Sequence, residues 1–330
     1  MKKAKTEIYD RIIDCLNRAG NVLIVSHLDP DGDSIGSQLA LRRYLLDIGK
    51  NVNVASDGTI PGKYRFLPDI ERIRTPHAFE SEGKPDLAVV LECPELGRAG
   101  RAADLIGDDT PIINIDHHPD NVGFGDIILI DKGAAAVGEI LTEIFVEKEI
   151  PIDRDTATLL YTAILTDTGR FRFSSTTNRT MTLAGILIDR GADPGDIVDK
   201  VYYSFSETTL KLIGRAFSAM ELHENGRICL VPLNRELLSG NGLEPADTEG
   251  MAEYTLYGAD VMVGALLKEM DDHTVKVSLR SRDGINVSRL AHRYGGGGHT
   301  NAAGFTTHDS LAAISSRLLA DLKEIVHDMV

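Results

Sequence analysis

The sequence is poor in cysteine and has no long apolar run, and each scarcity excludes a class of protein. The three cysteines, Cys15, Cys93 and Cys229, lie far apart, and none has CxxC spacing. They exclude a disulfide framework and indicate structural thiols in a reducing compartment. No apolar stretch approaches the roughly 18 residues of a membrane span, and the N-terminus lacks the apolar core of a signal peptide. We predict a cytoplasmic protein that does not associate with a membrane.

Positive charge is also scarce in this chain. Its 35 lysines and arginines face 50 aspartates and glutamates, which gives a formal net charge of −15. Proteins that coat long nucleic acids need a broad basic surface, so we predict no long nucleic-acid partner. A short phosphorylated substrate is compatible with this charge, because bound divalent cations would reverse the electric field locally.

Strand-like and helix-like segments alternate in the first part of the chain. Predicted strands cover residues 22–26, 52–55, 87–91, 112–115 and 127–130, and predicted helices cover 34–46, 137–147 and 154–165. This alternation is typical of an α/β fold with a doubly wound parallel sheet, which we assign to a domain of residues 1–190. A break rich in glycine and proline opens a predicted helical linker, residues 191–225. Short strands, a glycine-rich loop and a last amphipathic helix predict a smaller α/β domain over residues 226–330.

Charged side chains stand at the ends of four apolar segments in the first domain. These residues are His27, Asp31, Asp33, Glu92, Asp116, His117, His118 and Asp167. Charged groups rarely occupy such positions unless they are paired or bind a metal, and the carboxyl ends of parallel strands meet at one edge of a sheet. Six of these residues form the pool of candidate metal ligands, which has two imidazoles and four carboxylates: His27, Asp31, Asp33, Glu92, His117 and Asp167. Because it lacks thiolates, it suits two ions of Mn, Mg or Zn better than Cu(I) or an iron–sulfur cluster.

Each of these residues could also serve a purely structural purpose. Asp31 and Asp33 could form a turn and cap the following helix, and His117 and His118 could be ordinary loop histidines. An acid such as Asp167 at a helix C-terminus opposes the helix dipole, which favours a functional reason for its presence. The residues taken together favour a metal centre.

A second group of candidate functional residues lies in the smaller domain. Four consecutive glycines, residues 295–298, let the backbone approach a ligand closely, and a row of backbone N–H groups binds anions. His299 and Asn301 add side-chain donors, and Arg280 ends a predicted strand with a guanidinium suited to phosphate. The glycines could instead form a flexible linker. We predict a phosphate-binding site that includes these side chains.

Five ordered motifs carry a resemblance to a known family. They are His27-Leu-Asp-Pro-Asp31-Gly-Asp33, Leu91-Glu92, Asp116-His117-His118, Thr166-Asp167-Thr168-Gly169 and Gly295-Gly-Gly-Gly-His299. Together they resemble the DHH phosphoesterases that have a C-terminal DHH-associated domain. Within that family the chain is most similar to the bacterial nanoRNase and pAp phosphatase type, and the resemblance covers nearly the whole chain.

The resemblance implies a dinuclear manganese site, with Mg²⁺ or Co²⁺ as alternatives. The implied ligands are His27 and Asp31 for one metal, Asp33, His117 and Asp167 for the other, and Glu92 as the bridge. Asp116 would orient His117, and His118 would face the scissile phosphate. The implied substrate contacts in the second domain are Gly296, Gly297, His299 and Arg280.

The resemblance also implies an activity, the hydrolysis of short oligoribonucleotides or of 3′-phosphoadenosine 5′-phosphate (pAp) by water that two metals activate. It allows a homodimer. The first alternative is a phosphodiesterase of cyclic di-AMP or of its linear product pApA, as in other members of the family. The family usually has Asp where this chain has Glu92, and we predict that the two-metal site survives with altered spacing or metal preference. The second alternative is a nucleic-acid-binding protein that has lost catalysis through Glu92.

Overall fold

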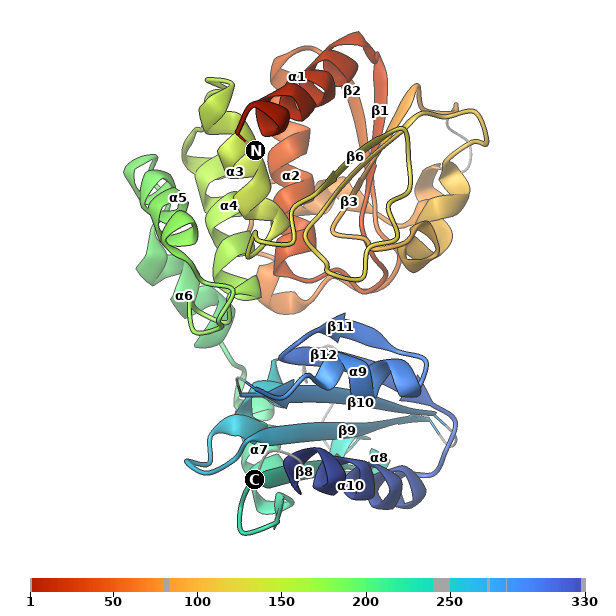
Figure 1. Cartoon of the computed structure of the whole chain (residues 1–330), viewed down its shortest axis with the longest axis vertical. Coiled ribbons are helices and arrows are strands. Elements are labelled where there is room, and N and C mark those ends of the chain that lie inside the picture. The colour runs from red at the N-terminus through yellow and green to blue at the C-terminus, as the bar shows by residue number, and fades with distance from the viewer. Residues whose placement is uncertain (1, 80–82, 240–249, 272–273, 283, 328–330) are drawn as a thin grey trace. The chain divides into compact units, whose positions relative to one another are not determined.

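The computed structural model describes residues 2–79, 83–239, 250–271, 274–282 and 284–327. Within these residues, no helix is long and apolar enough to cross a membrane. The chain divides into two compact units, Met1–Ser204 and Phe205–Val330 (Figure 1). The division falls inside the predicted linker, residues 191–225. Helix α6 (Pro194–Tyr202) belongs to the first unit and α7 (Glu207–Ser218) to the second, so the two units share this segment.

A six-stranded parallel sheet forms the centre of the first unit, which confirms the predicted α/β fold. Its strands are β1 (Asn21–Val25), β2 (Asn51–Ala55), β3 (Ile73–Arg74), β4 (Leu87–Leu91), β5 (Ile112–Asp116) and β6 (Ile127–Ile130). The strand order β3-β2-β1-β4-β5-β6 changes direction between β1 and β4. In open α/β sheets such a switch point forms a crevice beyond the carboxyl ends of the two strands, where ligands bind. The loops after β1 and β4 are therefore the expected place for a site.

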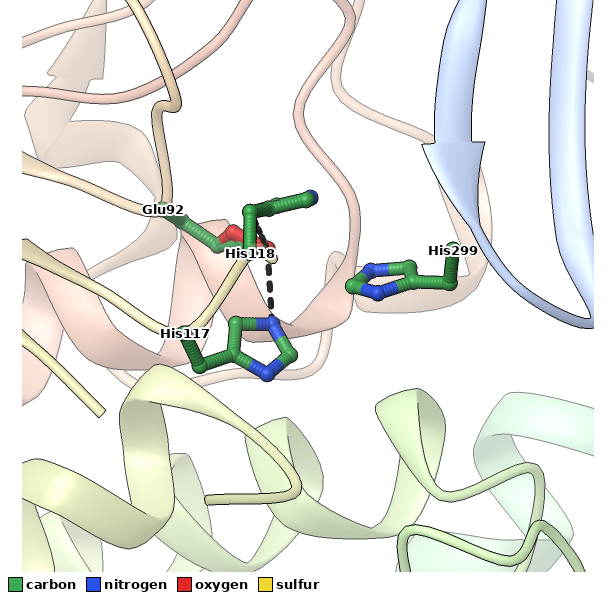
Figure 2. A group of neighbouring side chains, drawn as sticks. All are labelled: Glu92, His117, His118 and His299. Atoms are coloured by element: carbon green, nitrogen blue, oxygen red, sulfur yellow. Dashed lines mark hydrogen bonds and ion pairs between the residues drawn. The ribbon is translucent and has the colours of Figure 1, made fainter. Parts of the chain in front are cut away.

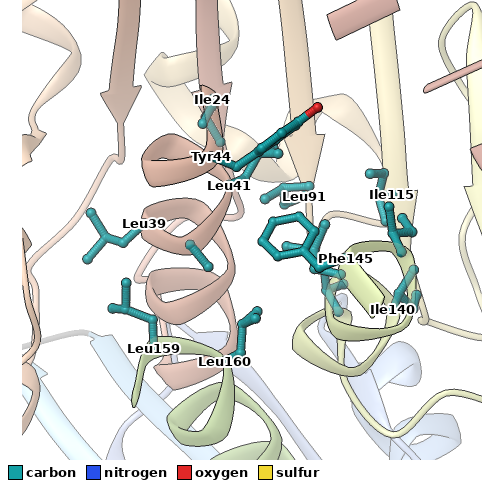
Figure 3. Packing of buried hydrophobic residues seen from close by; sticks show 14 of the residues in the cluster. Ile24, Leu39, Leu41, Tyr44, Leu91, Ile115, Ile140, Phe145, Leu159 and Leu160 are labelled. Carbon is teal, nitrogen blue, oxygen red and sulfur yellow. The ribbon is translucent and has the colours of Figure 1, made fainter. Parts of the chain in front are cut away.

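Both faces of this sheet are covered, which explains its almost continuous apolar strands. Alternate residues of a strand point to opposite faces, so Ile24 packs with the helices while Val25 packs with the 3-10 segment η4 (Leu96–Leu105). The helices are α1 (Lys2–Arg18), α2 (Gly32–Asp47), α3 (Val137–Glu147), α4 (Arg154–Asp167) and α5 (Asn178–Asp189). Shorter 3-10 segments are η1 (Gly62–Tyr64), η2 (Ile70–Arg72) and η3 (Pro76–Phe79). Figure 3 shows apolar side chains of β1, β4 and β5 packed against α2, α3 and α4.

Two glycines of α2 allow it to pack closely against α4. A Cβ atom on Gly36 would lie 2.4 Å from the carbonyl oxygen of Leu159. A Cβ atom on Gly32 would lie 2.4 Å from Oγ1 of Thr166. The first turn of α2 therefore lies beside the last turn of α4, and both turns carry predicted metal ligands.

We expect the Gly36→Ala variant to lose about 1–3 kcal/mol of unfolding free energy, the usual cost of an extra methyl group in a packed interior. The new methyl group would meet a backbone oxygen that cannot rotate away. Gly185→Ala in α5 is the matched control, because nothing lies within 4 Å of its added Cβ. The control should gain roughly 0.5–1 kcal/mol through helix propensity. Urea denaturation of both variants measures the difference, and equal stabilities would contradict the close-packing argument.

The second unit contains a smaller mixed sheet, as the sequence predicts for this domain. Its strands are β7 (Glu221–His223), β8 (Ile228–Leu233), β9 (Val263–Asp271), β10 (Thr274–Ser281), β11 (Gly297–His299) and β12 (Ala302–Thr307), in the order β11-β12-β10-β9-β8-β7. Only β8 and β9 pair in parallel among the described strands of this unit. The other elements are α8 (Arg235–Ser239), α9 (Val287–Arg293), α10 (Leu311–His327) and η6 (Met251–Leu256). Buried side chains of α9 and α10 form one apolar cluster with the sheet, and those of α7 and η6 form another.

The glycine-rich stretch is partly a strand and not an open loop throughout. Strand β11 pairs antiparallel with β12, and this pairing requires glycine at two positions. A Cβ atom on Gly296 would lie 2.1 Å from the carbonyl oxygen of Gly304. Gly298 has a φ angle of +130°, which residues with a side chain rarely adopt. The fold itself thus explains two of the four glycines.

Candidate metal centre

The loop between β1 and α2 places His27 and Asp31 close together. Asp31 is the N-cap of α2, because its Oδ1 accepts the backbone N–H of Ser34 at 3.0 Å. Its Oδ2 lies 3.9 Å from Nε2 of His27. The carbonyl oxygen of Leu28 lies 2.8 Å from Nδ1 of His27, and since a carbonyl only accepts, we assign the ring proton to Nδ1. The lone pair of Nε2 is thereby available to a metal ion or to the Ser34 hydroxyl, 2.9 Å away.

Asp33 is completely buried and joins α2 to the start of α3. Its Oδ2 accepts the backbone N–H of Val137 at 2.6 Å, and its Oδ1 accepts that of Gly138 at 2.8 Å. The hydroxyl of Ser37 also donates to Oδ1 at 2.9 Å. These bonds satisfy free N–H groups at the start of α3. The structural alternative, a cap of the following helix, is thus observed for Asp31 and not for Asp33, which lies inside α2.

His117 lies between the buried carboxylate of Asp33 and the half-buried carboxylate of Asp167, both from the helical layer. Its Nε2 is 3.3 Å from Oδ2 of Asp167 and 4.0 Å from Oδ2 of Asp33. One ligand atom from each of these three residues lies within 4.8 Å of the others. Nδ1 of His117 lies 3.2 Å from the carbonyl oxygen of Ala134, an arrangement that places a proton on Nδ1 and turns Nε2 toward the carboxylates of Glu92 and Asp167, where it could bind a metal. The sequence carries no signal for this contact, because the acceptor is a backbone atom.

Glu92 connects the two histidines of the Asp116-His117-His118 motif (Figure 2). Its Oε1 lies 3.2 Å from Nε2 of His117 and 3.4 Å from Nδ1 of His118. Burial opposes the ionisation of Glu92, but the charges of His118 and His117 hold its pKa below the usual range. Its backbone has a φ angle of +55°, a conformation that persists only when the surroundings enforce it. Among the described residues, the buried Oε2 of Glu92 has no hydrogen-bond partner.

The side chain of Asp116 differs from its predicted role, because it holds the ring of His118 instead of the ring of His117. Its Oδ1 lies 2.8 Å from Nδ1 of His118 and accepts the backbone N–H of His117 at 2.7 Å. Burial alone would lower the pKa of His118, but the charges of Glu92 and Asp116 raise it to about 9. Asn121, which is a loop cap through its contact with Gly123 N–H, also donates to Oδ2 of Asp116 at 2.6 Å.

The electrostatics of this cluster show an excess of negative charge. Burial, together with the charge of Glu92, raises the pKa of Asp33 to about 7. Burial also raises the pKa of Asp167 well above its usual value. Burial disfavours a charged His117, yet its hydrogen bond to Glu92 and the charge of Asp167 raise its pKa well above the usual value. Without a metal ion, the cluster therefore gains positive charge by binding protons.

These observations fit a divalent metal ion. The carboxylate oxygens and imidazole nitrogens are the donors that Mn²⁺ and Mg²⁺ accept. A buried, ionised and unpartnered oxygen such as Oε2 of Glu92 is costly unless a cation or a donor satisfies it. A metal ion would also supply the positive charge that protons otherwise provide.

The candidate residues of the second unit are partly engaged within it. Asn301 donates from Nδ2 to the carbonyl oxygens of Ser281 and Arg282 and to the Ser281 hydroxyl, so its amide group holds the turn before β12. The nearby Arg282, two residues after the candidate Arg280, donates to three backbone carbonyls of the segment around η6. Arg280 lies on β10 opposite Ala302 of β12, and His299 ends β11.

Comparison with known proteins agrees with the motifs and the fold. Residues 21–164 match the N-terminal domain of the DHH family, and residues 228–328 match the DHHA1 domain. The bifunctional oligoribonuclease and PAP phosphatase NrnA of Thermus thermophilus is 32% identical over 289 residues, which cover 87% of this chain and 84% of that protein. A crystal structure of an exopolyphosphatase-related protein from Bacteroides fragilis has a TM-score of 0.89 and 27% identity, with 98% of both chains covered.

A more distant similarity concerns the cyclic-di-AMP phosphodiesterase PdeA of Listeria monocytogenes. It is 25% identical, and the match covers 96% of this chain but only 50% of that protein. The two matched domains, the ordered motifs and the parallel sheet lead to one conclusion. The chain belongs to the DHH family of phosphoesterases, with a DHHA1 domain after the DHH domain.

Proposed function

We propose that this protein hydrolyses phosphate esters in short oligoribonucleotides and in pAp, with two bound divalent ions. Mn²⁺ is our first choice, and Mg²⁺ or Co²⁺ are the alternatives. The observation that carries the proposal is the meeting of Asp33, His117 and Asp167, whose ligand atoms lie within 4.8 Å of one another. The activities named for the Thermus relative supply the substrate class.

The proposed ligands divide between the two ions as the motifs suggest. They are His27 and Asp31 for one ion, Asp33, His117 and Asp167 for the other, and Glu92 between them. When bound, such ions polarise the phosphoryl oxygens and lower the pKa of a water molecule. His118 is fixed through Nδ1 by Asp116, and in the metal-free protein the charges of Glu92 and Asp116 raise its pKa to about 9. We assign its Nε2–H to the phosphate or to the leaving oxygen, where it stabilises developing charge.

The geometry of Glu92 favours an active centre over the catalytically impaired alternative. Its carboxylate is held ionised by two histidines, which lower its pKa. Its Oε1 lies 3.2 Å from a ring nitrogen of His117 and 3.4 Å from one of His118. The longer arm thus points into the cluster. We infer that Glu92 takes the bridging position of the usual aspartate and changes the metal preference of the site.

We assign the second unit to binding the phosphate of the substrate that is not cleaved. Arg280, Gly296, Gly297 and His299 are the proposed contacts, while Asn301 shapes the turn that presents them. Binding of this phosphate positions the substrate and limits the length of substrate that the protein accepts.

Arg280→Ala is expected to raise KM about 10- to 100-fold and to change kcat little, because a charge-assisted hydrogen bond contributes about 1.5–3 kcal/mol in both the ground state and the transition state. Steady-state kinetics with pAp measure the two constants. Arg289→Ala, which alters an arginine of α9 that is no proposed substrate contact, is the control. A loss confined to kcat would contradict the role in substrate binding.

A phosphodiesterase of cyclic di-AMP or pApA is the second candidate, favoured by the similarity to PdeA. The relative that carries the lead proposal matches more of its own length than PdeA does. Because both activities use the same metal centre, the geometry of the site does not distinguish between them. A direct comparison of the substrates distinguishes between them.

A panel of substrates tests the proposed function. The purified protein is incubated with Mn²⁺ and an RNA dinucleotide, a five-residue RNA, a 24-residue RNA, pAp, pApA or cyclic di-AMP, with Asp31→Ala as the control. Rapid loss of the shortest RNAs and pAp, absent in the control, supports the proposal. Activity confined to cyclic di-AMP or pApA would replace it with the second candidate. Inactivity toward every substrate would revive the impaired alternative, and Glu92→Asp would then be the variant to test for restored activity.

Two points from the sequence concern the whole protein. The cytoplasmic location stays a prediction, and the homodimer stays a state that the family resemblance allows. Light scattering after size-exclusion chromatography measures the molar mass, and a value equal to that of one chain, 35.9 kDa, would exclude the homodimer.

A further inference from the structure

We propose that Arg179 of α5 is a positioning residue for the metal centre. It acts through the segment of residues 131–138, which we call the ligand-support loop and which runs from the end of β6 into α3. The inference rests on the metal centre assigned under the proposed function. Arg179 itself touches none of the proposed ligands among its described ion pairs.

The ligand-support loop holds two proposed metal ligands at once. The carbonyl oxygen of Ala134 lies 3.2 Å from Nδ1 of His117 and fixes its ring. Three and four residues later, the N–H groups of Val137 and Gly138 donate to the two carboxylate oxygens of Asp33. A shift of this loop would therefore turn the imidazole of His117 and move the carboxylate of Asp33 together.

Arg179 holds the ligand-support loop through two carboxylates, which lie on either side of the loop residue that contacts His117. Its Nη1 donates to Oδ2 of Asp131 at 2.8 Å, at the beginning of the loop. Its Nε forms an ion pair at 3.1 Å with Oε1 of Glu139, without hydrogen-bond geometry. The other oxygen of Glu139 accepts the backbone N–H of Ala135 at 3.2 Å. Nη2 of Arg179 pairs with Glu143. One planar guanidinium thus reaches three carboxylates, which an ammonium group on a flexible stem does not reproduce.

Lys5 also pairs with two of these carboxylates, but it does not duplicate the role of Arg179. We call Arg179, Lys5 and the three carboxylates the charge cluster. Nζ of Lys5 lies 3.0 Å from Asp131 and 2.7 Å from Glu143. Among the described residues, however, Arg179 is the only cation within ion-pair distance of Glu139. Because Glu139 is completely buried, its carboxylate would lack a counter-charge without Arg179. The contact of Glu139 with Ala135 is therefore the part of the loop that depends most on the arginine.

Manganese affinity measured by isothermal titration calorimetry tests this inference. Arg179→Lys keeps the charge and loses the planar fork, and we expect its Kd for Mn²⁺ to rise about 10- to 100-fold, as for the loss of other groups that orient ligands. Titrations are run at a temperature where circular dichroism shows every variant fully folded. The double variant Arg179→Met/Glu139→Gln removes the half-buried arginine charge together with the buried carboxylate charge. It should show the same loss, which keeps the test valid if Arg179→Lys fails to fold.

A matched control separates positioning from general destabilisation. Leu187→Ala changes a fully buried residue of the same helix that has no place in the charge cluster, and its Kd should stay near that of wild type. Nitrogen NMR of His117 gives a second readout, because the hydrogen bond from Nδ1–H to the carbonyl oxygen of Ala134 should be lost in Arg179→Lys and retained in Leu187→Ala.

The outcomes distinguish this inference from the proposed function. Wild-type protein that does not bind Mn²⁺ would overturn the proposed metal centre and this inference with it. Wild-type binding with an unchanged Kd in Arg179→Lys would overturn only the inference. Equal losses of affinity in Arg179→Lys and Leu187→Ala would also overturn it, since they would show a purely structural role.

Discussion

Replacement of Asp167 by asparagine is expected to abolish turnover and, at the same time, to stabilise the metal-free protein. The turnover number should fall by roughly three orders of magnitude or more, because removing a direct ligand costs more than the 10- to 100-fold loss caused by an outer partner. The gain in stability follows from the raised pKa of Asp167, whose charged form is unfavourable in the folded state. An amide removes that charge, so we expect the free energy of unfolding of the metal-free protein to increase.

Asp189→Asn provides the matched control for this variant. Asp189 ends α5 as Asp167 ends α4, so both replacements remove an acid that opposes a helix dipole. Asp189 is exposed and lies outside the cluster. Urea denaturation in EDTA measures stability, and Mn²⁺-dependent hydrolysis of pAp measures turnover. Full activity of Asp167→Asn would refute its assignment as a ligand, and a loss of stability would refute the electrostatic argument.

The metal-free protein is expected to become less stable as the pH rises from about 4 to about 9. Asp33 has a pKa raised from 3.8 to about 7, so its contribution is greatest at low pH and disappears as the pH passes about 7. His117 and His118 act in the same direction, because their raised pKa values add stability below pH 6.5 that is lost at higher pH, near pH 9 for His118. Glu92 has the opposite sign, since its lowered pKa adds stability above pH 4.5 that is lost only in acid.

Saturating Mn²⁺ should reverse this trend, because the metal takes the place of the protons and binds best to deprotonated ligands. At a concentration 1,000 times Kd, the gain should be about 4 kcal/mol, which corresponds to roughly 8–16 °C in Tm for a domain of about 200 residues. Thermal denaturation at pH 5, 7 and 9, in EDTA or in Mn²⁺, measures both effects. In EDTA, the fall of Tm with rising pH should be smaller in Asp167→Asn, because this variant lacks one group with a raised pKa. A Tm in EDTA that rises from pH 5 to pH 9 would contradict the prediction.

The sequence predicted the large elements of the first unit well and its small elements poorly. The predicted strand at residues 112–115 is observed as Ile112–Asp116, and the helix at 154–165 as Arg154–Asp167. Strands buried on both faces read as continuous apolar runs, which are easy to recognise. The two-residue strand β3 and the 3-10 segment η4 lack such a run or a regular period. Strand β11 was hidden because glycine has no side chain to indicate a buried face.

The sequence by itself determined the donor types of the candidate centre and the edge of the sheet where they meet, because charged residues at the ends of apolar strands are costly unless a partner or a metal ion compensates them. Only the tertiary structure decided which atom faces which. It shows Asp116 bonded to the ring of His118, the carbonyl of Ala134 bonded to His117, and Asp33 bonded to the start of α3. Asp116 and His118 are only two positions apart, but the other two partners are backbone atoms, and Asp33 and Val137 lie about a hundred positions apart in the chain. Local sequence pattern carries no information on either, since such contacts are set by the packing of whole helices against the sheet.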